Sequence, residues 1–227
     1  MNKFYANYWE FKGYETQTLK PKHIRDFDRE IWNKTQCNTD MRFLEVGCGT
    51  GQVLGYLKSK GAKDVTGIDQ DPALAEFIPE AAQNDFQAID INEFLAGPGK
   101  TARFDRIFLF DVLEHFTHAD GQELLKKLSG VLAPKGGILL KMPNMSSPWG
   151  AQHQYGDLTH VAAYTPTSIR QMALSVGLTC TWCGPNVQGS PMRRFLDPLY
   201  HGILSRILMT APEIWTAHFY AYLEDPS

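Results

Sequence analysis

Phe43-Leu44-Glu45-Val46-Gly47-Cys48-Gly49-Thr50-Gly51 joins an apolar, strand-like run to a turn in which every second residue is glycine. Glycine adopts positive φ and lets a ligand lie against bare backbone. Residues 52–60 then have the pattern of a helix. We therefore expect a strand, a tight turn and a helix, which together form a cradle for a nucleotide-like ligand.

The acid before the turn, Glu45, indicates which kind of nucleotide-like ligand the turn binds. Glu45 stands where a dinucleotide would bring its pyrophosphate, and like charges repel. The glycines are spaced G-x-G-x-G, whereas the dinucleotide fingerprint is G-x-G-x-x-G. A ligand with an adenosine, no phosphate and a positive end suits this site better, and S-adenosylmethionine (SAM) fits that description.

With these features the sequence resembles the class I SAM-dependent methyltransferases, whose first motif is (Glu/Asp)-x-Gly-x-Gly-x-Gly. The resemblance runs over about residues 42–142 and continues more weakly to residue 223. It implies a Rossmann-like, seven-stranded, mostly parallel α/β sheet with helices on both faces and an antiparallel last strand.

The alternation of apolar runs with helical patterns agrees with such a sheet. We expect strands at 43–46, 65–68, 86–88, 106–110, 138–141, 178–184 and 216–223. We expect helices at 23–33, 52–60, 72–78, 91–95, 121–132 and 167–176. The predicted organisation is an aromatic and helical segment at 1–41 before a SAM-binding domain at 42–227, with an acceptor loop at 143–165 and a helical insertion at 185–215.

Two of these segments have more than one interpretation. Phe4, Tyr5, Tyr8 and Trp9 precede the first helix, which either packs on the sheet or belongs to a flap over the cofactor. In the insertion, apolar residues recur at helical spacing: Leu199, Ile203, Leu204, Ile207 and Leu208. We expect a helix packed on the fold; the alternatives are a substrate cap or a membrane-surface contact.

Composition limits the partners. The 227 residues carry a formal net charge of −3 and no run of Lys or Arg, so no nucleic-acid partner is expected. Residues 1–12 lack the pattern of a signal peptide, and no apolar run approaches about 20 residues, so we expect a cytoplasmic protein. Cys180-x-x-Cys183 lies in an apolar run without a second Cys pair or nearby His, so we expect reduced thiols and no metal.

Acids after the next two strands complete a predicted cofactor site. Asp69 follows its strand about 20 residues beyond the glycine turn, where it can accept hydrogen bonds from both ribose hydroxyls. The resemblance assigns Asp90 to the adenine amino group and the backbone of Ile91 to the ring. For both acids the alternative is a helix cap, although Asp71 fits that role better than Asp69.

The run Phe110-Asp111-Val112-Leu113-Glu114-His115 ends the fourth strand and is similar to the fourth motif of small-molecule methyltransferases. We expect Glu45 and Asp111 to help hold the ammonium end of SAM. The expected cofactor contacts are Glu45, Gly47, Cys48, Gly49, Gly51, Asp69, Gln70, Asp90, Ile91, Phe110, Asp111 and Val112.

Two histidines are candidate bases for a hydroxyl acceptor. His115 is placed by the fourth-strand motif, and His160 lies in Tyr155-Gly156-Asp157-Leu158-Thr159-His160, where Asp157 could orient it. This loop resembles one common in bacterial methyltransferases of polysaccharide and glycan gene clusters. His153 and Tyr155 are candidate acceptor contacts, and a hydrogen-bonded loop scaffold is the alternative role for the segment.

We therefore expect a methyltransferase that acts on a hydroxyl of a sugar or glycan precursor. A quinone or lipid-like phenol is the alternative acceptor. Outside this class, the alternatives are an aminopropyl or carboxymethyl transferase and a SAM-binding module without catalysis. The sequence leaves the oligomeric state open.

Overall fold

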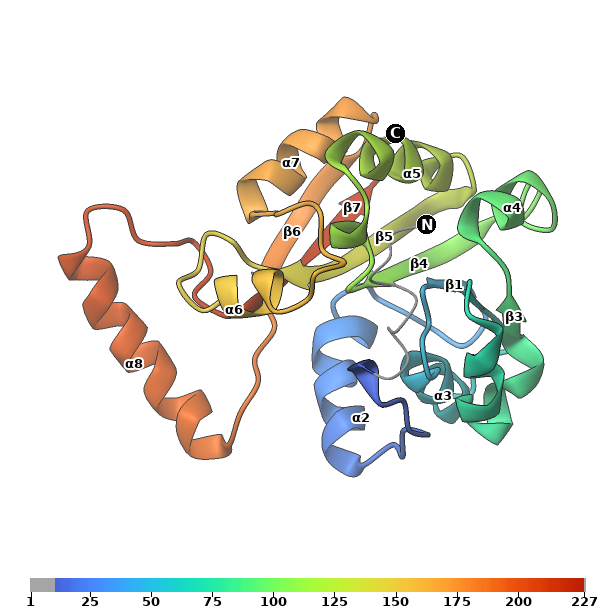
Figure 1. Cartoon of the computed structure of the whole chain (residues 1–227), viewed down its shortest axis with the longest axis horizontal. Coiled ribbons are helices and arrows are strands. Elements are labelled where there is room, and N and C mark those ends of the chain that lie inside the picture. The colour runs from blue at the N-terminus through green and yellow to red at the C-terminus, as the bar shows by residue number, and fades with distance from the viewer. Residues whose placement is uncertain (1–10, 227) are drawn as a thin grey trace.

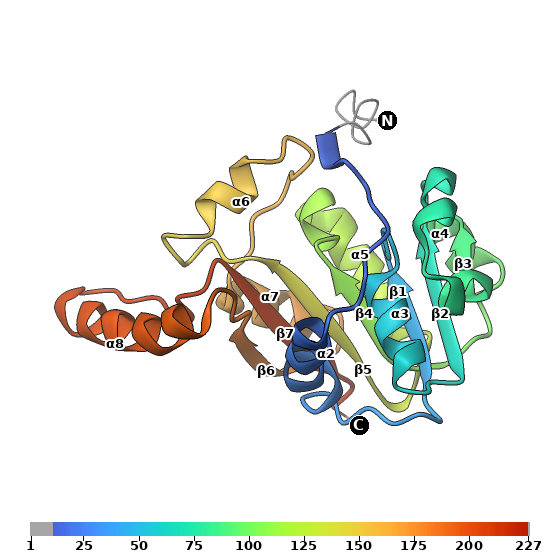
Figure 2. The ribbon, with the colours of Figure 1, turned by 90° about the horizontal axis from the view of Figure 1, so that it is seen from below.

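The computed structural model describes residues 11–226 and contains a seven-stranded sheet with helices on both faces (Figures 1 and 2). The strand order is β3-β2-β1-β4-β5-β7-β6. Neighbouring strands from β3 to β5 are parallel, and β7 runs antiparallel to both β5 and β6. This confirms the predicted Rossmann-like sheet with an antiparallel last strand. The strands are β1 (Arg42–Val46), β2 (Asp64–Asp69), β3 (Phe86–Ala88), β4 (Phe104–Phe110), β5 (Leu132–Pro143), β6 (Thr179–Pro185) and β7 (His218–Glu224).

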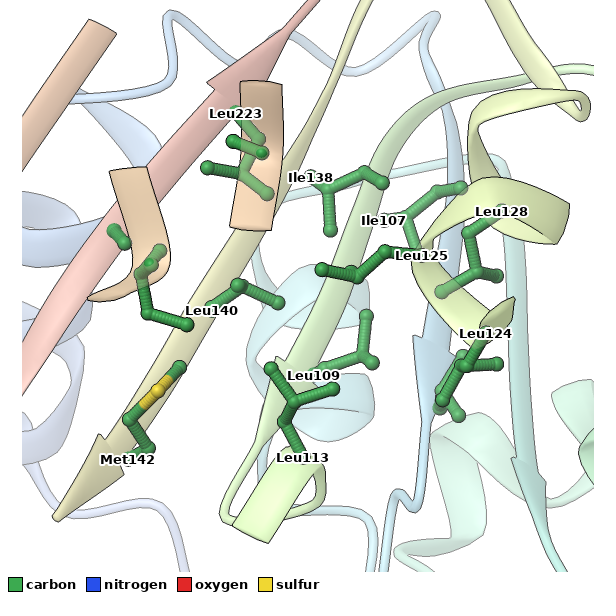
Figure 3. Close-up of a cluster of buried hydrophobic side chains, with 14 of the residues drawn as sticks. Ile107, Leu109, Leu113, Leu124, Leu125, Leu128, Ile138, Leu140, Met142 and Leu223 are labelled. Carbon is green, nitrogen blue, oxygen red and sulfur yellow. The ribbon is translucent and has the colours of Figure 1, made fainter. Parts of the chain in front are cut away.

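Two apolar cores cover the two faces of the sheet, because successive side chains of a strand point to opposite sides. One core packs β1, β4 and β5 against α4 (Ile91–Ala96), α5 (His118–Ser129) and α7 (Pro166–Ser175). Figure 3 shows part of it, where Leu125 of α5 lies next to Ile107 of β4 and Ile138 of β5. The other core packs Phe43 and Phe108 against α3 (Gln52–Ser59).

The predicted helix at 23–33 is α2 (Pro21–Phe27), which continues without a break as the π-helix η2 (Asp28–Trp32). Ile31 is fully buried, and the Trp32 ring stacks on Phe43 of β1 with centroids 6.3 Å apart. Of the two interpretations of this helix, the structure shows the one in which it packs on the sheet. The four aromatic residues Phe4, Tyr5, Tyr8 and Trp9 lie outside the described residues.

Some helices begin or end at other residues than predicted, because of hydrogen bonds at their ends. The helix predicted at 121–132 is α5, which begins earlier because Thr117 Oγ1 accepts a hydrogen bond of 3.1 Å from the Asp120 backbone N–H. Leu132 belongs instead to β5. The segment predicted as a helix at 72–78 forms a 3₁₀ helix. The short helices are η3 (Pro72–Phe77), η4 (Glu80–Asp85), η5 (Leu113–His115) and α6 (Ala151–Tyr155).

β6 and β7 pair antiparallel at the edge of the sheet, and the insertion between them forms α8 (Pro191–Ile207). This helix was expected to pack on the fold, but its apolar residues do not do so. From Met192 to Ile207 no residue is buried, and α8 lies at one end of the molecule (Figures 1 and 2). Its polar side, not its apolar side, contacts the rest of the chain, as described below. The domain boundary at residue 42 and the limits of the two inserted segments stay predictions.

Candidate active site

The glycine-rich turn after β1 lies at the carboxyl edge of the parallel strands. Gly47, Gly49 and Gly51 have φ angles of +67°, +52° and +70°, which residues with a Cβ rarely adopt. A Cβ at Gly47 would lie 2.5 Å from Val112 Cγ2, whereas a Cβ at Gly49 would meet no atom within 4 Å. The turn is closed against Val112 and open over Gly49, where a ligand can reach the backbone.

Asp69, at the end of β2, holds this turn. Its Oδ2 accepts a hydrogen bond of 3.0 Å from Gly49 N–H, and its Oδ1 accepts one of 3.1 Å from Asp71 N–H. Burial raises the pKa of Asp69, and these two hydrogen bonds oppose the rise. Each carboxylate oxygen has further acceptor capacity, so a ribose could still bind here. Asp71 caps η3 through Ala73 N–H, as predicted, and Gln70 is exposed.

Glu45 lies in β1 and is buried on the same face as Phe43, beside α3. Its Oε2 has no hydrogen-bond partner among the described residues. Burial, and then the negative charge of Asp69, raise the pKa of Glu45 well above its usual value. A cation that arrives with a ligand would favour the ionised form of this buried carboxyl group. The neighbouring Cys48 is also buried, which raises the pKa of its thiol and keeps it neutral.

Asp90 acts as a helix cap. Its Oδ1 accepts hydrogen bonds from the backbone N–H groups of Asn92 and Glu93, at 2.7 Å and 3.4 Å, at the start of α4. Ile91, the first residue of that helix, is buried. The alternative role of Asp90 is therefore present in the structure. Both hydrogen bonds use the same oxygen, and a contact to adenine through the other one stays a prediction.

The end of β4 brings Asp111 to the same edge of the sheet. Asp111 has a φ of +56° and is exposed, and its Oδ2 lies 2.5 Å from Lys141 Nζ. Lys141 also lies over the ring of Phe110. An ammonium ligand would have to compete with Lys141 for this carboxylate, so Glu45 is the better placed of the two expected acids.

The loop at 143–165 is anchored over this edge by Asn144. This residue is fully buried, and its Nδ2 donates to the backbone carbonyls of Ile214 and Thr216 at 2.7 Å and 3.2 Å. At the other end of the loop, Val161 N–H donates to the Glu114 carbonyl at 2.8 Å. The loop is thus fastened both to the segment before β7 and to the fourth-strand motif.

His160 lies inside this loop, with 8% of its side chain exposed. Its Nδ1 is 3.2 Å from the Gln154 carbonyl oxygen, and its Nε2 is 3.9 Å from Asp157 Oδ2. Asp157 itself accepts hydrogen bonds from the backbone and hydroxyl of Thr159 and pairs with Lys12 at 3.0 Å. The expected orienting partner of His160 was Asp157, but the atom within hydrogen-bond distance is the Gln154 carbonyl.

His115 and His160 are brought together. Their rings meet edge to face, with centroids 4.7 Å apart. Burial, and then the charge of His160, lower the pKa of His115 to about 4. Burial also lowers the pKa of His160, although the charge of Asp157 opposes this. Both imidazoles are therefore neutral near pH 7, as a proton acceptor has to be.

The two predicted acceptor contacts lie on α6. The ring of His153 meets that of His218 edge to face, with centroids 4.4 Å apart, and His218 Nε2 lies 3.9 Å from Asp111 Oδ1. His153 thus joins the same group of polar side chains. Tyr155 is 71% exposed and is the last residue of that helix.

Several polar residues at this edge were missed from the sequence. The largest omission is Glu114, which is fully buried and whose two carboxylate oxygens have no hydrogen-bond partner among the described residues. Burial, and then the charge of Asp111, raise the pKa of Glu114 to about 8. Its place in the fourth-strand motif was the available signal. His218 begins β7, and because β7 is antiparallel its start lies beside the end of β5, where Pro143 pairs with it.

Cys180 and Cys183 are free thiols with their sulfur atoms 3.4 Å apart. Within residues 11–226 no three His, Cys, Asp or Glu side chains are grouped as ligands of a metal ion. In the same range no helix combines the length and apolarity needed to cross a bilayer.

Comparisons with known proteins agree with this fold. The sequence pattern of the methyltransferase domain family matches residues 18–181. A ubiquinone biosynthesis O-methyltransferase from Bradyrhizobium diazoefficiens is 27% identical over 154 residues, which cover 63% of this chain and 59% of that protein. A tRNA U34 carboxymethyltransferase from Methylococcus capsulatus is 33% identical over 112 residues, covering 44% of this chain and 31% of that protein. The chain thus spans less than two thirds of the length of these relatives.

Solved structures share the fold over nearly the whole chain. A SAM-dependent methyltransferase from Archaeoglobus fulgidus superposes with a TM-score of 0.68 at 17% identity, covering 98% of this chain and 100% of its own. Magnesium protoporphyrin IX methyltransferase from Synechocystis PCC 6803, solved with bound S-adenosylhomocysteine (SAH), has a TM-score of 0.62 at 16% identity and covers 98% and 95%. Because the family pattern covers most of the chain and the fold agrees with it, this protein belongs to the methyltransferase domain family.

Proposed function

We propose that the protein transfers a methyl group from SAM to a hydroxyl of a sugar or glycan precursor. The observation that carries the proposal is the contact between the rings of His115 and His160 at the edge of the sheet that also holds the open glycine turn; burial lowers the pKa of both histidines. A turn of this kind suits the adenosine part of SAM, and the buried Glu45 suits its cationic end. The family and the fold support the same cofactor.

Methyl transfer from a sulfonium is an in-line displacement with a neutral leaving group. The carbon–sulfur bond breaks as the acceptor oxygen forms a bond to the methyl carbon, and SAH leaves. The main task of the protein is to align the acceptor and exclude water. The loop at 143–165 lies where it can do both, because Asn144 fastens it above the carboxyl edge.

His160 is the proposed base. A carbonyl oxygen only accepts hydrogen bonds, so the bond to Gln154 requires the proton of neutral His160 to be on Nδ1. The lone pair is then on Nε2, which takes the hydroxyl proton as the methyl group is transferred. Asp157, 3.9 Å from Nε2, stabilises the imidazolium that forms.

The acceptor class rests on the loop sequence Asp157-Leu158-Thr159-His160 and on the absence of a basic run along the chain. A quinone or lipid-like phenol is the second candidate. Two observations favour it: one relative is a ubiquinone biosynthesis O-methyltransferase, and α8 presents an exposed apolar side.

The first test is calorimetric titration of the purified protein with SAM and SAH, with NAD as the control. We expect micromolar binding of the first two and none of NAD. Folded protein that does not bind SAM would refute the proposed cofactor. SAH release is then measured with a panel of nucleotide-sugars, glycolipids and phenols.

The base is tested with His160→Gln, which keeps a polar side chain but removes the proton acceptor. Loss of general-base catalysis should lower kcat by about 10²–10⁴-fold while SAM affinity is kept. His23→Gln, on α2, is a matched control and should leave kcat unchanged. Full turnover by His160→Gln would remove this histidine from the mechanism, and turnover only with phenols would replace the glycan acceptor.

A further inference from the structure

The outer side of α8 carries a continuous row of exposed apolar side chains. They are between 49% and 72% exposed and recur every three or four residues, which places them on one side of the helix. We call this row the apolar stripe; it consists of Met192, Phe195, Leu196, Leu199, Ile203 and Ile207. Tyr200 lies at its edge and is 53% exposed.

Polar contacts on the opposite side fix the orientation of α8. Arg194 forms two bonds of 3.0 Å and 2.9 Å with the carboxylate of Asp26. His201 stacks on Trp215 with centroids 4.8 Å apart, and Trp215 Nε1 donates to Ser205 Oγ at 3.0 Å. At 3.6 residues per turn these three helix positions lie about 180° from the apolar stripe. The stripe therefore faces away from the rest of the chain.

The charges beside the stripe are basic. Arg193 lies near Leu196 and Tyr200 on one edge, and Arg206 lies near Leu199 and Ile203 on the other, by helical spacing. The carboxylate in α8 is that of Asp197, 3.8 Å from Arg193. A helix with an apolar stripe, an aromatic residue at its edge and arginines on both flanks fits a bilayer surface that carries anionic headgroups.

A second copy of the chain fits the stripe less well. Pairing two α8 helices through their stripes would bring four arginine side chains close together against two Asp197 carboxylates. Like charges held together in a contact are destabilising. Lipid phosphates, in contrast, can pair with Arg193 and Arg206 at the same time as the stripe enters the apolar layer.

α8 also contacts the loop that carries His160. Trp149 Nε1 donates to His201 Nε2 at 3.4 Å, and the same loop exposes Tyr155 and Leu158 by 71% and 66%. Figures 1 and 2 show α6, which belongs to this loop, beside α8. A surface that holds α8 thus lies close to the candidate acceptor loop.

From these contacts we propose that α8 docks the protein onto bilayers containing anionic lipids, with the apolar stripe between the headgroups and Arg193 and Arg206 on the phosphates. The proposal concerns this helix alone and does not depend on which acceptor is methylated. It defines an interfacial helix, which lies in the plane of the membrane surface and does not cross it.

The test is co-sedimentation of the full chain with phosphatidylcholine vesicles, with and without phosphatidylglycerol. We expect binding to the anionic vesicles that weakens as salt is raised. Ile203→Glu should reduce the partition coefficient by at least about tenfold, since a large apolar contact is replaced by a charge. Leu174→Glu is the matched control, because Leu174 is 69% exposed on α7 and outside the stripe. It should bind as the parent chain does.

The arginines are tested by Arg193→Gln combined with Arg206→Gln, which should weaken binding by about fivefold per charge and remove most of its salt dependence. Arg103→Gln, exposed before β4, is the control. SAM titration and thermal melting check that each variant is folded.

Absence of vesicle binding by the folded parent chain would overturn the proposal, as would equal binding by Ile203→Glu and Leu174→Glu. Light scattering tests the other candidate occupant of the stripe, a second copy of the chain. A dimer that Ile203→Glu converts to a monomer, without vesicle binding, would assign the stripe to a second copy of the chain.

Discussion

Lys12 Nζ lies 3.0 Å from Asp157 Oδ2, which joins the segment before α2 to the loop that carries His160. The Asp157 side chain is 8% exposed and that of Lys12 is 37% exposed. Burial raises the pKa of Asp157, but the hydrogen bonds from Thr159 and the ion pair with Lys12 outweigh this and lower it. The N-terminal segment therefore contributes a charge to the candidate site.

Replacing this charge should change the pH dependence of catalysis. The charge of Lys12 lowers the pKa of both His115 and His160. In Lys12→Met both pKa values should rise, so the acid limb of the kcat/KM profile should move to higher pH. The unfolding free energy should fall by less than about 1 kcal/mol, because Lys12 is partly exposed. Lys22→Met, on the exposed side of α2, is the control and should leave the acid limb unchanged. If the acid limb lies at the same pH in Lys12→Met and in the parent chain, Lys12 does not influence the histidines.

Gly49→Ala should separate ligand binding from backbone strain. Gly49 and Gly177 have φ angles of +52° and +81°, and a Cβ at either position would meet no atom within 4 Å. Each alanine variant should therefore cost about 1 kcal/mol of unfolding free energy, from the left-handed backbone alone. Only Gly49→Ala should also weaken SAM binding, by about tenfold or more, because its methyl group occupies the open side of the turn. Calorimetry and thermal melting measure both quantities, and equal SAM affinity in the two variants would place the ligand elsewhere.

Because Glu45 is buried and its pKa is raised, we expect SAM binding to release a proton from it. Burial and the charge of Asp69 raise the pKa of Glu45, and a bound ammonium group should lower it again. The observed binding enthalpy at neutral pH should then vary with the ionisation enthalpy of the buffer. In Glu45→Gln the affinity should fall about tenfold and this part of the buffer dependence should disappear. Glu93→Gln, exposed on α4, should keep both, and a Glu45→Gln variant that also kept both would argue against this acid as the partner of the ammonium group.

Glu114 should make the fold less stable as pH rises. Its folded-state pKa of about 8 lies above its ordinary value of 4.5, so its contribution is complete below about pH 4.5 and is lost as pH rises through 8. Between about pH 6.5 and 8 the unfolding free energy of the parent should fall by about 1–2 kcal/mol from this group. Glu114→Gln should flatten this slope, as measured by urea unfolding across the range.

The exposed Glu123→Gln on α5 is the control for that slope and should leave it unchanged. The lowered pKa values of His115 and His218, both about 4, act in the opposite direction and in a lower window. Their contributions are complete above about pH 6.5 and are lost as pH falls toward 4. A parent chain whose stability is flat between pH 6.5 and 8 would show that Glu114 is not buried as an acid.

Local sequence determined most of the sheet and its first turn. The apolar run at 43–46 and the alternating glycines predicted β1 and the turn, because apolar character and the ability to adopt positive φ are properties of individual residues. The same reasoning placed Asp69 at the carboxyl edge and Asp71 at a helix cap. Where a prediction shifted, as for α5, a side chain had provided a cap that the apolar pattern did not show.

Tertiary structure alone decided which side of α8 is covered and which charges meet at the candidate site. The spacing of its leucines and isoleucines predicted one apolar side, but the direction of that side depends on Asp26 and Trp215, which are distant in sequence. Glu114 is buried because the loop folds back and Val161 N–H binds its carbonyl. Sequence thus determined the features that depend on neighbouring residues, whereas burial, pairing and pKa shifts depend on contacts that form only when distant segments pack together.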